Sequence, residues 1–217
     1  MKTILVIGLS KFGIHLAEKL MQLENEVVVI DKDAKIVESF DNKFTDSFIG
    51  DCRNEEVLKS LGVHNFDICF VTIDQDFQSS LEITSMLKEY GAKYVISNAN
   101  RDRQADFLKK IGADEVIYPE KESAVKNAVR FTDNHIFEYM PMTEDYSIYE
   151  IDTPDLWIGK TITDLNIRKK YNINIVAIKN DTEFNPVPDP QYVFKAEDHL
   201  VIIGKNDIIE KITKKTI

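Results

Sequence analysis

The stretch ILVIGLSKFG (residues 4–13) decides the fold of this chain. An apolar run ends at Gly8, and Gly13 lies where a following helix would pack tightly against that run. A glycine turn between a buried strand and a helix is the first part of a dinucleotide-binding loop. The middle glycine of such a loop is replaced here by Ser10. The prediction therefore depends on what surrounds the loop.

The second predicted strand supports a nucleotide-binding role for this loop. The run VVVID (27–31) ends in Asp31, 18 positions after Gly13. The N–H groups at the positive end of a helix hold phosphate, and an acid ending the second strand accepts hydrogen bonds from ribose hydroxyls and disfavours a 2′-phosphate. Ser10 narrows the approach of a pyrophosphate, although its hydroxyl can donate to a phosphate oxygen. The alternative is that Gly8 and Gly13 serve only the turn and its packing.

Apolar runs alternate with segments of helical period through residue 118, and this alternation predicts the fold class. The runs fall at 4–8, 27–31, 47–50, 67–73, 94–97 and 115–118. Near-continuous apolar strands separated by helices indicate a parallel sheet covered on both faces. We therefore expect an α/β, Rossmann-like doubly wound sheet.

Beyond Pro119 the alternation of apolar runs and helical segments ends. Ala124, Val125, Ala128 and Val129 place an apolar stripe on a helix predicted over 120–132, and a partner subunit would bury it. We expect a first domain over 1–132, a linker over 133–145 that contains Pro141, and a small α+β domain over 146–217.

The composition of the chain argues against several classes of function and location. The 217 residues include 27 basic and 37 acidic side chains, a formal charge of −10 that disfavours nucleic acid as a partner. No run approaches the roughly 20 apolar residues of a membrane span, and no secretory leader is recognisable. Cys52 and Cys69 adjoin apolar segments without metal-ligand spacing, and are interpreted as reduced thiols in the core of a cytosolic protein.

Nothing in the sequence adds a hydride-transfer site to the loop. Such an enzyme needs a general acid or base facing the nicotinamide, and none of the four histidines is placed convincingly for that role. The last 75 or so residues are also few for a substrate domain. The pattern favours binding over turnover. A small NAD-dependent oxidoreductase and a scaffold that has lost its ligand remain as alternatives.

Four blocks of sequence resemble one family. VIGLSKFG (6–13) resembles its VIGLGRFG, and GDCRNEEVLKSLGVHNFD (50–67) resembles the stretch that follows its third strand. KIGADEVIYPEKES (110–123) and ITDLNIRKKYNINIVAIK (162–179) follow in the family's order and spacing. By these blocks the chain resembles the regulatory subunits of Ktr/Trk-type potassium transporters, which are built from RCK (regulator of potassium conductance) N- and C-domains.

The resemblance implies a cytoplasmic sensor that is peripheral to the inner face of the cell membrane. Its N-domains would bind ATP or ADP, or alternatively NAD(H), and its dimers would assemble into an octameric ring beneath a potassium-translocating membrane subunit. Gly8, Gly13 and Asp31 would hold phosphate and ribose, Asp51 would lie beside adenine, and Glu120 would bind a divalent cation or Na⁺ near the phosphates. The remaining candidates are Ser10, Lys11, Phe12, Lys32 and Cys52, which flank these positions, and Asn98.

Two positions depart from the family pattern. Lys11 stands where an arginine is usual, so it keeps the charge but loses the planar fork. Asp74 stands where a glycine is usual and adds negative charge near the proposed site. Together with Ser10, these departures leave the preferred nucleotide open.

In the C-domain, the resemblance implies a site for cyclic di-AMP at a dimer interface. The family's arginine and asparagine, six positions apart, match Arg168 and Asn174. An arginine fork suits phosphate, and an asparagine amide can contact phosphate or base. The residues that would flank the adenines are apolar: Ile162, Ile167, Ile175 and Pro188. The alternative is that Arg168 and Asn174 are an ordinary helix end and strand start.

Overall fold

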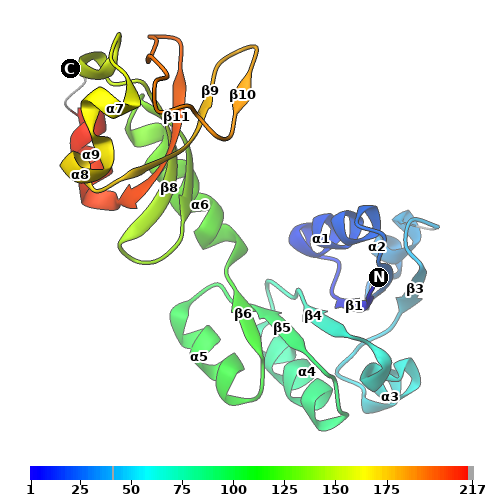
Figure 1. Cartoon of the computed structure of the whole chain (residues 1–217). Coiled ribbons are helices and arrows are strands. Elements are labelled where there is room, and N and C mark those ends of the chain that lie inside the picture. Colours follow the sequence, from blue (N-terminus) through cyan, green and yellow to red (C-terminus); the bar gives the residue numbers. More distant parts are fainter. Residues whose placement is uncertain (41, 215–217) are drawn as a thin grey trace. The chain divides into compact units, whose positions relative to one another are not determined.

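The computed structural model describes residues 1–40 and 42–214, and the chain divides into Met1–Lys121 and a second unit that begins at Glu122 (Figure 1). The first unit is built on a six-stranded parallel sheet in the order β3-β2-β1-β4-β5-β6. Its strands are β1 (Thr3–Ile7), β2 (Glu26–Asp31), β3 (Asp46–Ile49), β4 (Ile68–Val71), β5 (Val95–Asn98) and β6 (Glu115–Ile117). The order reverses between β1 and β4, where doubly wound sheets form their ligand crevice. The predicted fold class is confirmed.

Helices cover both faces of this sheet because successive side chains of β1 point to opposite sides. The helices of this unit are α1 (Lys11–Gln22), α2 (Ala34–Ser39), α3 (Glu55–Leu61), α4 (Phe77–Glu89) and α5 (Asp102–Lys110), and α6 (Pro119–Thr132) begins in this unit and continues into the second. Ile4 and Val6 pack in one cluster with α1 and α2, whereas Leu5 and Ile7 pack in another with α3 and α4. Because the helices cover the two faces of the sheet, a binding site is expected at the carboxyl ends of the strands.

The second unit is an antiparallel sheet with short helices. Its strand order is β10-β9-β11-β8-β7. The strands are β7 (Ile136–Pro141), β8 (Tyr146–Asp152), β9 (Asn174–Lys179), β10 (Phe184–Asn185) and β11 (His199–Lys205), and the helices are α7 (Ile162–Leu165), α8 (Ile167–Tyr171) and α9 (Asn206–Thr213). Trp157, Phe194, Leu200 and Ile202 are buried at its centre. This confirms the predicted small α+β domain.

The stretch 133–145, which the sequence presents as a linker, contains strand β7. This strand pairs with β8 and forms one edge of the second sheet. Pro141, which lies in the predicted linker, is the last residue of β7. Proline is tolerated on an edge strand because one side of that strand needs no hydrogen bonds to a neighbouring strand. The compact division of the chain falls earlier, after Lys121 and within α6.

Two further expectations concern the membrane and the thiols. Within residues 1–40 and 42–214, no helix combines the length and the apolar character that a bilayer span needs. Cys52 and Cys69 are both free and buried, and burial raises the pKa of each thiol to about 12. Both are therefore protonated core thiols, as predicted.

Candidate functional site

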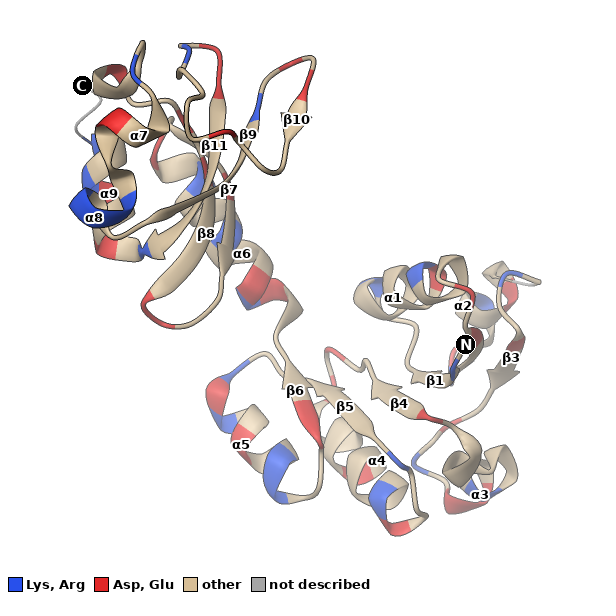
Figure 2. Ribbon diagram, in the orientation of Figure 1, with Lys and Arg blue, Asp and Glu red and all other residues tan. Residues whose placement is uncertain are grey.

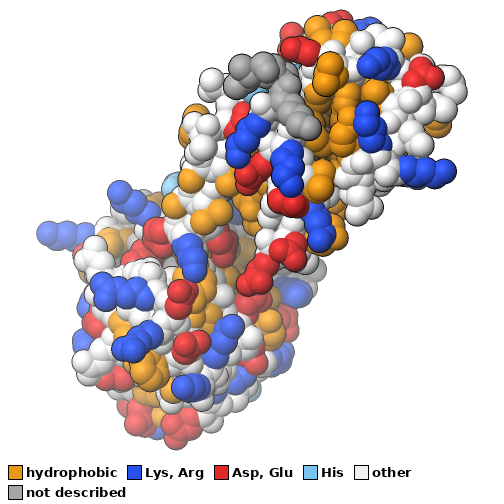
Figure 3. Space-filling view, turned by 90° about the vertical axis from the view of Figure 1, so that its left-hand side faces the viewer, with side chains coloured by type: hydrophobic (Ala, Val, Ile, Leu, Met, Phe, Trp, Pro, Cys, Tyr) orange, Lys and Arg blue, Asp and Glu red, His pale blue; other side chains and the backbone are white. Residues whose placement is uncertain are grey.

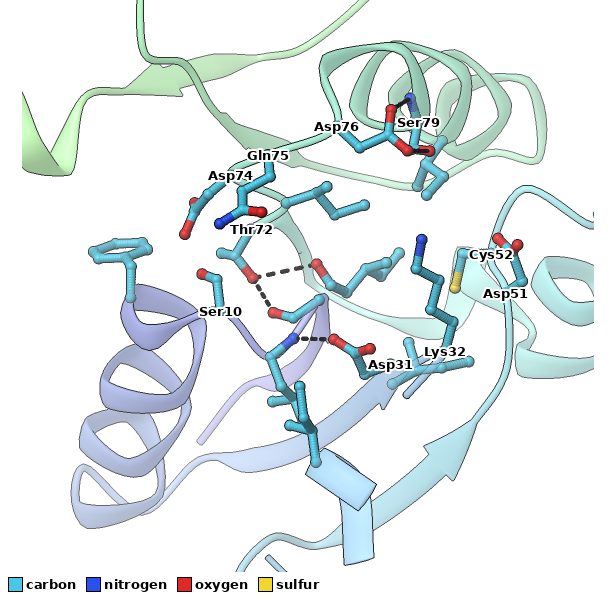
Figure 4. A pocket seen from close by; sticks show the side chains of 18 of the residues that line it. Ser10, Asp31, Lys32, Asp51, Cys52, Thr72, Asp74, Gln75, Asp76 and Ser79 are labelled. Atoms are coloured by element: carbon cyan, nitrogen blue, oxygen red, sulfur yellow. Dashed lines mark hydrogen bonds between the residues drawn. The ribbon is translucent and has the colours of Figure 1, made fainter. Parts of the chain in front are cut away.

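A cavity of about 650 Å³ opens where β1, β2, β3 and β4 end (Figure 4). Four turns of the first unit line it, and they contribute residues 8–12, 31–32, 50–53 and 72–76. Isoleucines from β1, β2, α2, α4 and the turn after β4 form its apolar walls: Ile7, Ile30, Ile36, Ile83 and Ile73. An apolar cavity with a few polar groups at the carboxyl ends of parallel strands is the usual form of a nucleotide site.

The turn after β1 is fixed against β4. Gly8 has φ +94°, which favours glycine, and its carbonyl accepts a hydrogen bond from the Thr72 hydroxyl. A Cβ on Gly13 would lie 2.6 Å from Thr72 Oγ1 and closer still to the Gly8 carbonyl oxygen. Gly13 is therefore required so that α1 can start directly against the end of β1 and against Thr72.

Ser10 caps α1. Its Oγ accepts a hydrogen bond from the Gly13 N–H at 3.2 Å, which leaves its own O–H as a donor. The N–H groups of Lys11 and Phe12 belong to the first turn, where a helix supplies no intrahelical acceptor. These residues line the cavity, so the helix start offers donors to an anion there.

Asp31 is oriented by backbone donors. Its Oδ2 accepts a hydrogen bond from the Leu9 N–H at 2.6 Å, and its Oδ1 accepts one from the Asp33 N–H at 2.9 Å. The half-buried carboxylate is thereby held between the loop after β1 and the start of α2. A carboxylate has about four acceptor positions, so two remain for the hydroxyls of a ribose.

Asp51 and Arg53 form the far wall of the cavity. Arg53 Nε lies 3.0 Å from both carboxylate oxygens of Asp51, and Arg53 Nη2 also donates to Oδ2. The hydrogen bonds from the Arg53 guanidinium lower the pKa of Asp51 to about 2, so this carboxylate is charged at neutral pH. Cys52 adds a buried apolar side chain between them. Arg53 was not among the predicted site residues, although its position two residues after Asp51 allows this pairing.

Asn98 does not line the cavity. It is 4% exposed, and its Nδ2 donates to Asp74 Oδ1 at 3.3 Å. Asp74 does line the cavity. Thr72 and Asp76 line it as well, and neither was predicted from the sequence. Asn98, a predicted site residue, thus contacts the cavity lining through its hydrogen bond to Asp74.

Glu120, the proposed metal ligand, lines the same cavity from the first turn of α6. Across residues 1–40 and 42–214, no three His, Cys, Asp or Glu side chains are grouped so as to hold a metal ion. Glu120 therefore does not belong to a ready-made cluster of such side chains in this part of the chain.

A second cavity, of about 410 Å³, lies in the second unit. It brings together every residue that the sequence analysis placed there: Ile162, Ile167, Arg168, Asn174, Ile175 and Pro188. Arg168 Nε donates to Asn174 Oδ1 at 2.7 Å, which leaves both Nη nitrogens of the guanidinium for other acceptors. Asn166, at φ +46°, separates α7 from α8, and α8 carries three consecutive basic residues (Figure 2).

Two family models match the two units. Residues 4–119 match the TrkA-N domain, and residues 146–216 match the TrkA-C domain. The chain is 36% identical to Ktr system potassium uptake protein C of Bacillus subtilis over 216 residues, which are 100% of this chain and 98% of that protein. It is 34% identical to Ktr system potassium uptake protein A of the same organism over 208 residues, 95% of this chain and 94% of that protein.

Solved structures share the fold. The GsuK RCK domain aligns with a TM-score of 0.70 at 15% identity, covering 99% of this chain and 47% of that chain. The GsuK channel bound to NAD aligns with a TM-score of 0.69 at 15% identity, covering 100% and 39%. The chain spans less than half the length of these channel chains. With two matching domain models and near-complete coverage of the Ktr proteins, the chain belongs to the RCK (regulator of potassium conductance) family of Ktr/Trk type, built from one TrkA-N and one TrkA-C domain.

Proposed function

We propose that this chain is the cytoplasmic, nucleotide-sensing regulatory subunit of a potassium uptake system. The observation that carries the proposal is the oriented Asp31 carboxylate beside the open first turn of α1. The relatives that match nearly their whole length are potassium uptake proteins, which supports the process. The chain would act at the inner face of the membrane by binding a potassium-translocating subunit.

The first cavity would take an adenine nucleotide, ATP or ADP, with NAD(H) as the alternative. Asp31 accepts hydrogen bonds from the ribose hydroxyls, and the N–H groups of Lys11 and Phe12 meet the phosphates. The ammonium of Lys11 adds charge without a planar fork, so it offers less directional contact to phosphate than arginine would. The apolar walls leave room for the base beside Cys52.

Glu120 would help to bind a divalent cation or Na⁺ at the phosphates. A carboxylate and a phosphate repel each other, and a cation between them removes that repulsion. The remaining ligands would come from phosphate oxygens, from water and from a second copy of the chain.

Self-association into dimers, and of dimers into a ring of eight, is part of the proposal. Every residue of α6 is at least partly exposed in the single chain, and Val125 on its apolar stripe is 43% exposed. Figure 3 shows charged side chains of both signs over the first unit and apolar side chains gathered on the second, where Phe131, Met140 and Val187 are exposed. A nucleotide would shift the ring between two shapes only by its difference in affinity for them.

The second cavity would take cyclic di-AMP. Arg168 presents free Nη donors to a phosphate, Asn174 orients the guanidinium, and the isoleucines and prolines of the cavity face the adenines. Two cavities in two units would let the chain respond to two ligands.

Replacing Asp31 by alanine tests the proposal. Because hydrogen bonds to a charged acceptor contribute roughly 1.5–3 kcal/mol, Asp31→Ala should weaken adenine-nucleotide binding about 10- to 150-fold. Isothermal titration of ATP, ADP and NADH into both proteins measures this, with Asp46→Ala, at the start of β3 and outside this cavity, as the control.

Each contrary outcome has a definite meaning. Unchanged affinity in Asp31→Ala would remove Asp31 from the site. A preference for NADH with measurable turnover would favour the oxidoreductase, and absence of binding by any nucleotide would favour the scaffold.

A further inference from the structure

The first cavity carries more negative than positive charge. Its lining includes three basic side chains, Lys11, Lys32 and Arg53, and five acidic ones, Asp31, Asp51, Asp74, Asp76 and Glu120. Carboxylates are anions, and ammonium and guanidinium groups are cations, in neutral water. The cavity proposed to hold an anionic nucleotide therefore has two more acidic than basic side chains in its lining. Where the acidic side chains lie relative to the phosphates determines which nucleotide the cavity accepts.

Three of the five acids, Asp31, Asp51 and Asp76, share the lining with the two cations Lys32 and Arg53. Asp51 is paired with Arg53, and Asp31 accepts two backbone hydrogen bonds. Asp76 caps α4 by accepting hydrogen bonds from the Ser79 N–H at 3.0 Å and from the Ser79 hydroxyl. The Lys32 ammonium also points into the middle of the cavity (Figure 4). Three acids against two cations leave one net negative charge in this part of the lining.

Asp74 is different. It follows β4, and Figure 4 shows its carboxylate pointing toward Ser10 at the start of α1. Its carbonyl oxygen accepts from Asn100 Nδ2 at 2.9 Å, and its Oδ1 accepts from Asn98 Nδ2 at 3.3 Å, so neutral amides hold it in place. None of the ion pairs formed by residues 1–40 and 42–214 includes Asp74. A fixed anion without a cationic partner thus faces the helix start that would receive phosphate.

We propose that Asp74 sets the phosphate specificity of this cavity by disfavouring nucleotides whose phosphate tail carries high charge. The inference rests on the proposed function and names the ligand class of the same site: adenine nucleotides with a short or weakly charged tail, bound in preference to ATP without a metal ion. Two like charges in a half-buried site repel more strongly than in water, and each added phosphate increases the repulsion. Lys11, the one lining cation on the loop after β1, is exposed and opposes this only partly.

Titrations of AMP, ADP and ATP into the full chain, in EDTA at fixed ionic strength, test the inference. For the unmodified chain, we expect ATP to bind no more tightly than AMP. In Asp74→Asn, which keeps the acceptor for Asn98 but removes the charge, we expect ATP to gain at least about tenfold relative to AMP, equivalent to about 1.4 kcal/mol. Asp46→Asn makes the same change in net charge outside this cavity and should leave the ATP-to-AMP ratio unchanged.

Asp74→Ser removes the charge with a differently shaped side chain and should give the same ratio as Asp74→Asn; it carries the test if Asp74→Asn loses its cooperative melting transition. The difference between variant and unmodified chain should also shrink as NaCl is raised, because salt screens charge. An ATP-to-AMP ratio that is the same with and without the Asp74 carboxylate would overturn the inference and leave the proposed function standing. Failure of the unmodified chain to bind any of the three would overturn both.

Discussion

Gly13→Ala is expected to lower the free energy of unfolding of this protein by about 3 kcal/mol, at the upper end of overpacking costs. The new Cβ would lie 2.6 Å from Thr72 Oγ1 and closer still to the Gly8 carbonyl oxygen. Neither neighbour can withdraw easily, because the Thr72 hydroxyl donates to that same carbonyl and to the Ile7 carbonyl. The start of α1 must move, and the loop that should receive phosphate moves with it.

Urea denaturation followed by far-UV circular dichroism measures this change. The single tryptophan, Trp157, lies in the second unit, so its fluorescence would report on the wrong part of the chain. Gly50→Ala is the matched control, since a Cβ there would meet only side-chain atoms of Val57 and Ile30, at 3.2 Å or more. A loss below about 1 kcal/mol in Gly13→Ala would mean that α1 does not pack against the end of β1 as described.

Arg168→Ala should abolish cyclic di-AMP binding and leave ATP binding unchanged. The Arg168 guanidinium is fixed by Asn174 and lines the second cavity, so its removal takes away the charged, planar donor that suits phosphate. The first cavity is built entirely from the first unit and does not contain it. Titration of both ligands into the variant gives the answer.

Lys169→Ala is the matched control for this variant, because Lys169 is the next basic residue of α8 and does not line the cavity. Retention of cyclic di-AMP binding in Arg168→Ala would contradict the assignment of the second cavity. Loss of both ligands would indicate that the variant chain had unfolded.

Much of the fold was predictable because its signals are local. Apolar runs, glycine stops and the period of the helices gave all six strands of the parallel sheet and the class of the second unit. Gly8, Gly13 and Asp31 were recognisable because the strand–turn–helix–strand context fixes their spacing. Arg168 and Asn174 were found through the family resemblance, and the fold then brings them within hydrogen-bond distance.

Other features depend on contacts that a linear reading does not contain. Ser10 reads as a substituted glycine, yet the hydrogen bond that it accepts from Gly13 makes it the cap of α1. Asn98 ends β5 and was expected in the cavity, but its buried amide reaches only Asp74. Residues 133–145 were predicted as a linker because their composition is mixed and includes Pro141, whereas pairing with β8 makes β7 the edge strand of a sheet.

A crystal structure of the chain soaked with ADP would show where the nucleotide binds. We expect both ribose hydroxyl oxygens within hydrogen-bond distance of the Asp31 carboxylate, and phosphate oxygens against the N–H groups of Lys11 and Phe12. Electron density for the nucleotide outside this cavity, or a cavity closed by its own side chains, would contradict this expectation.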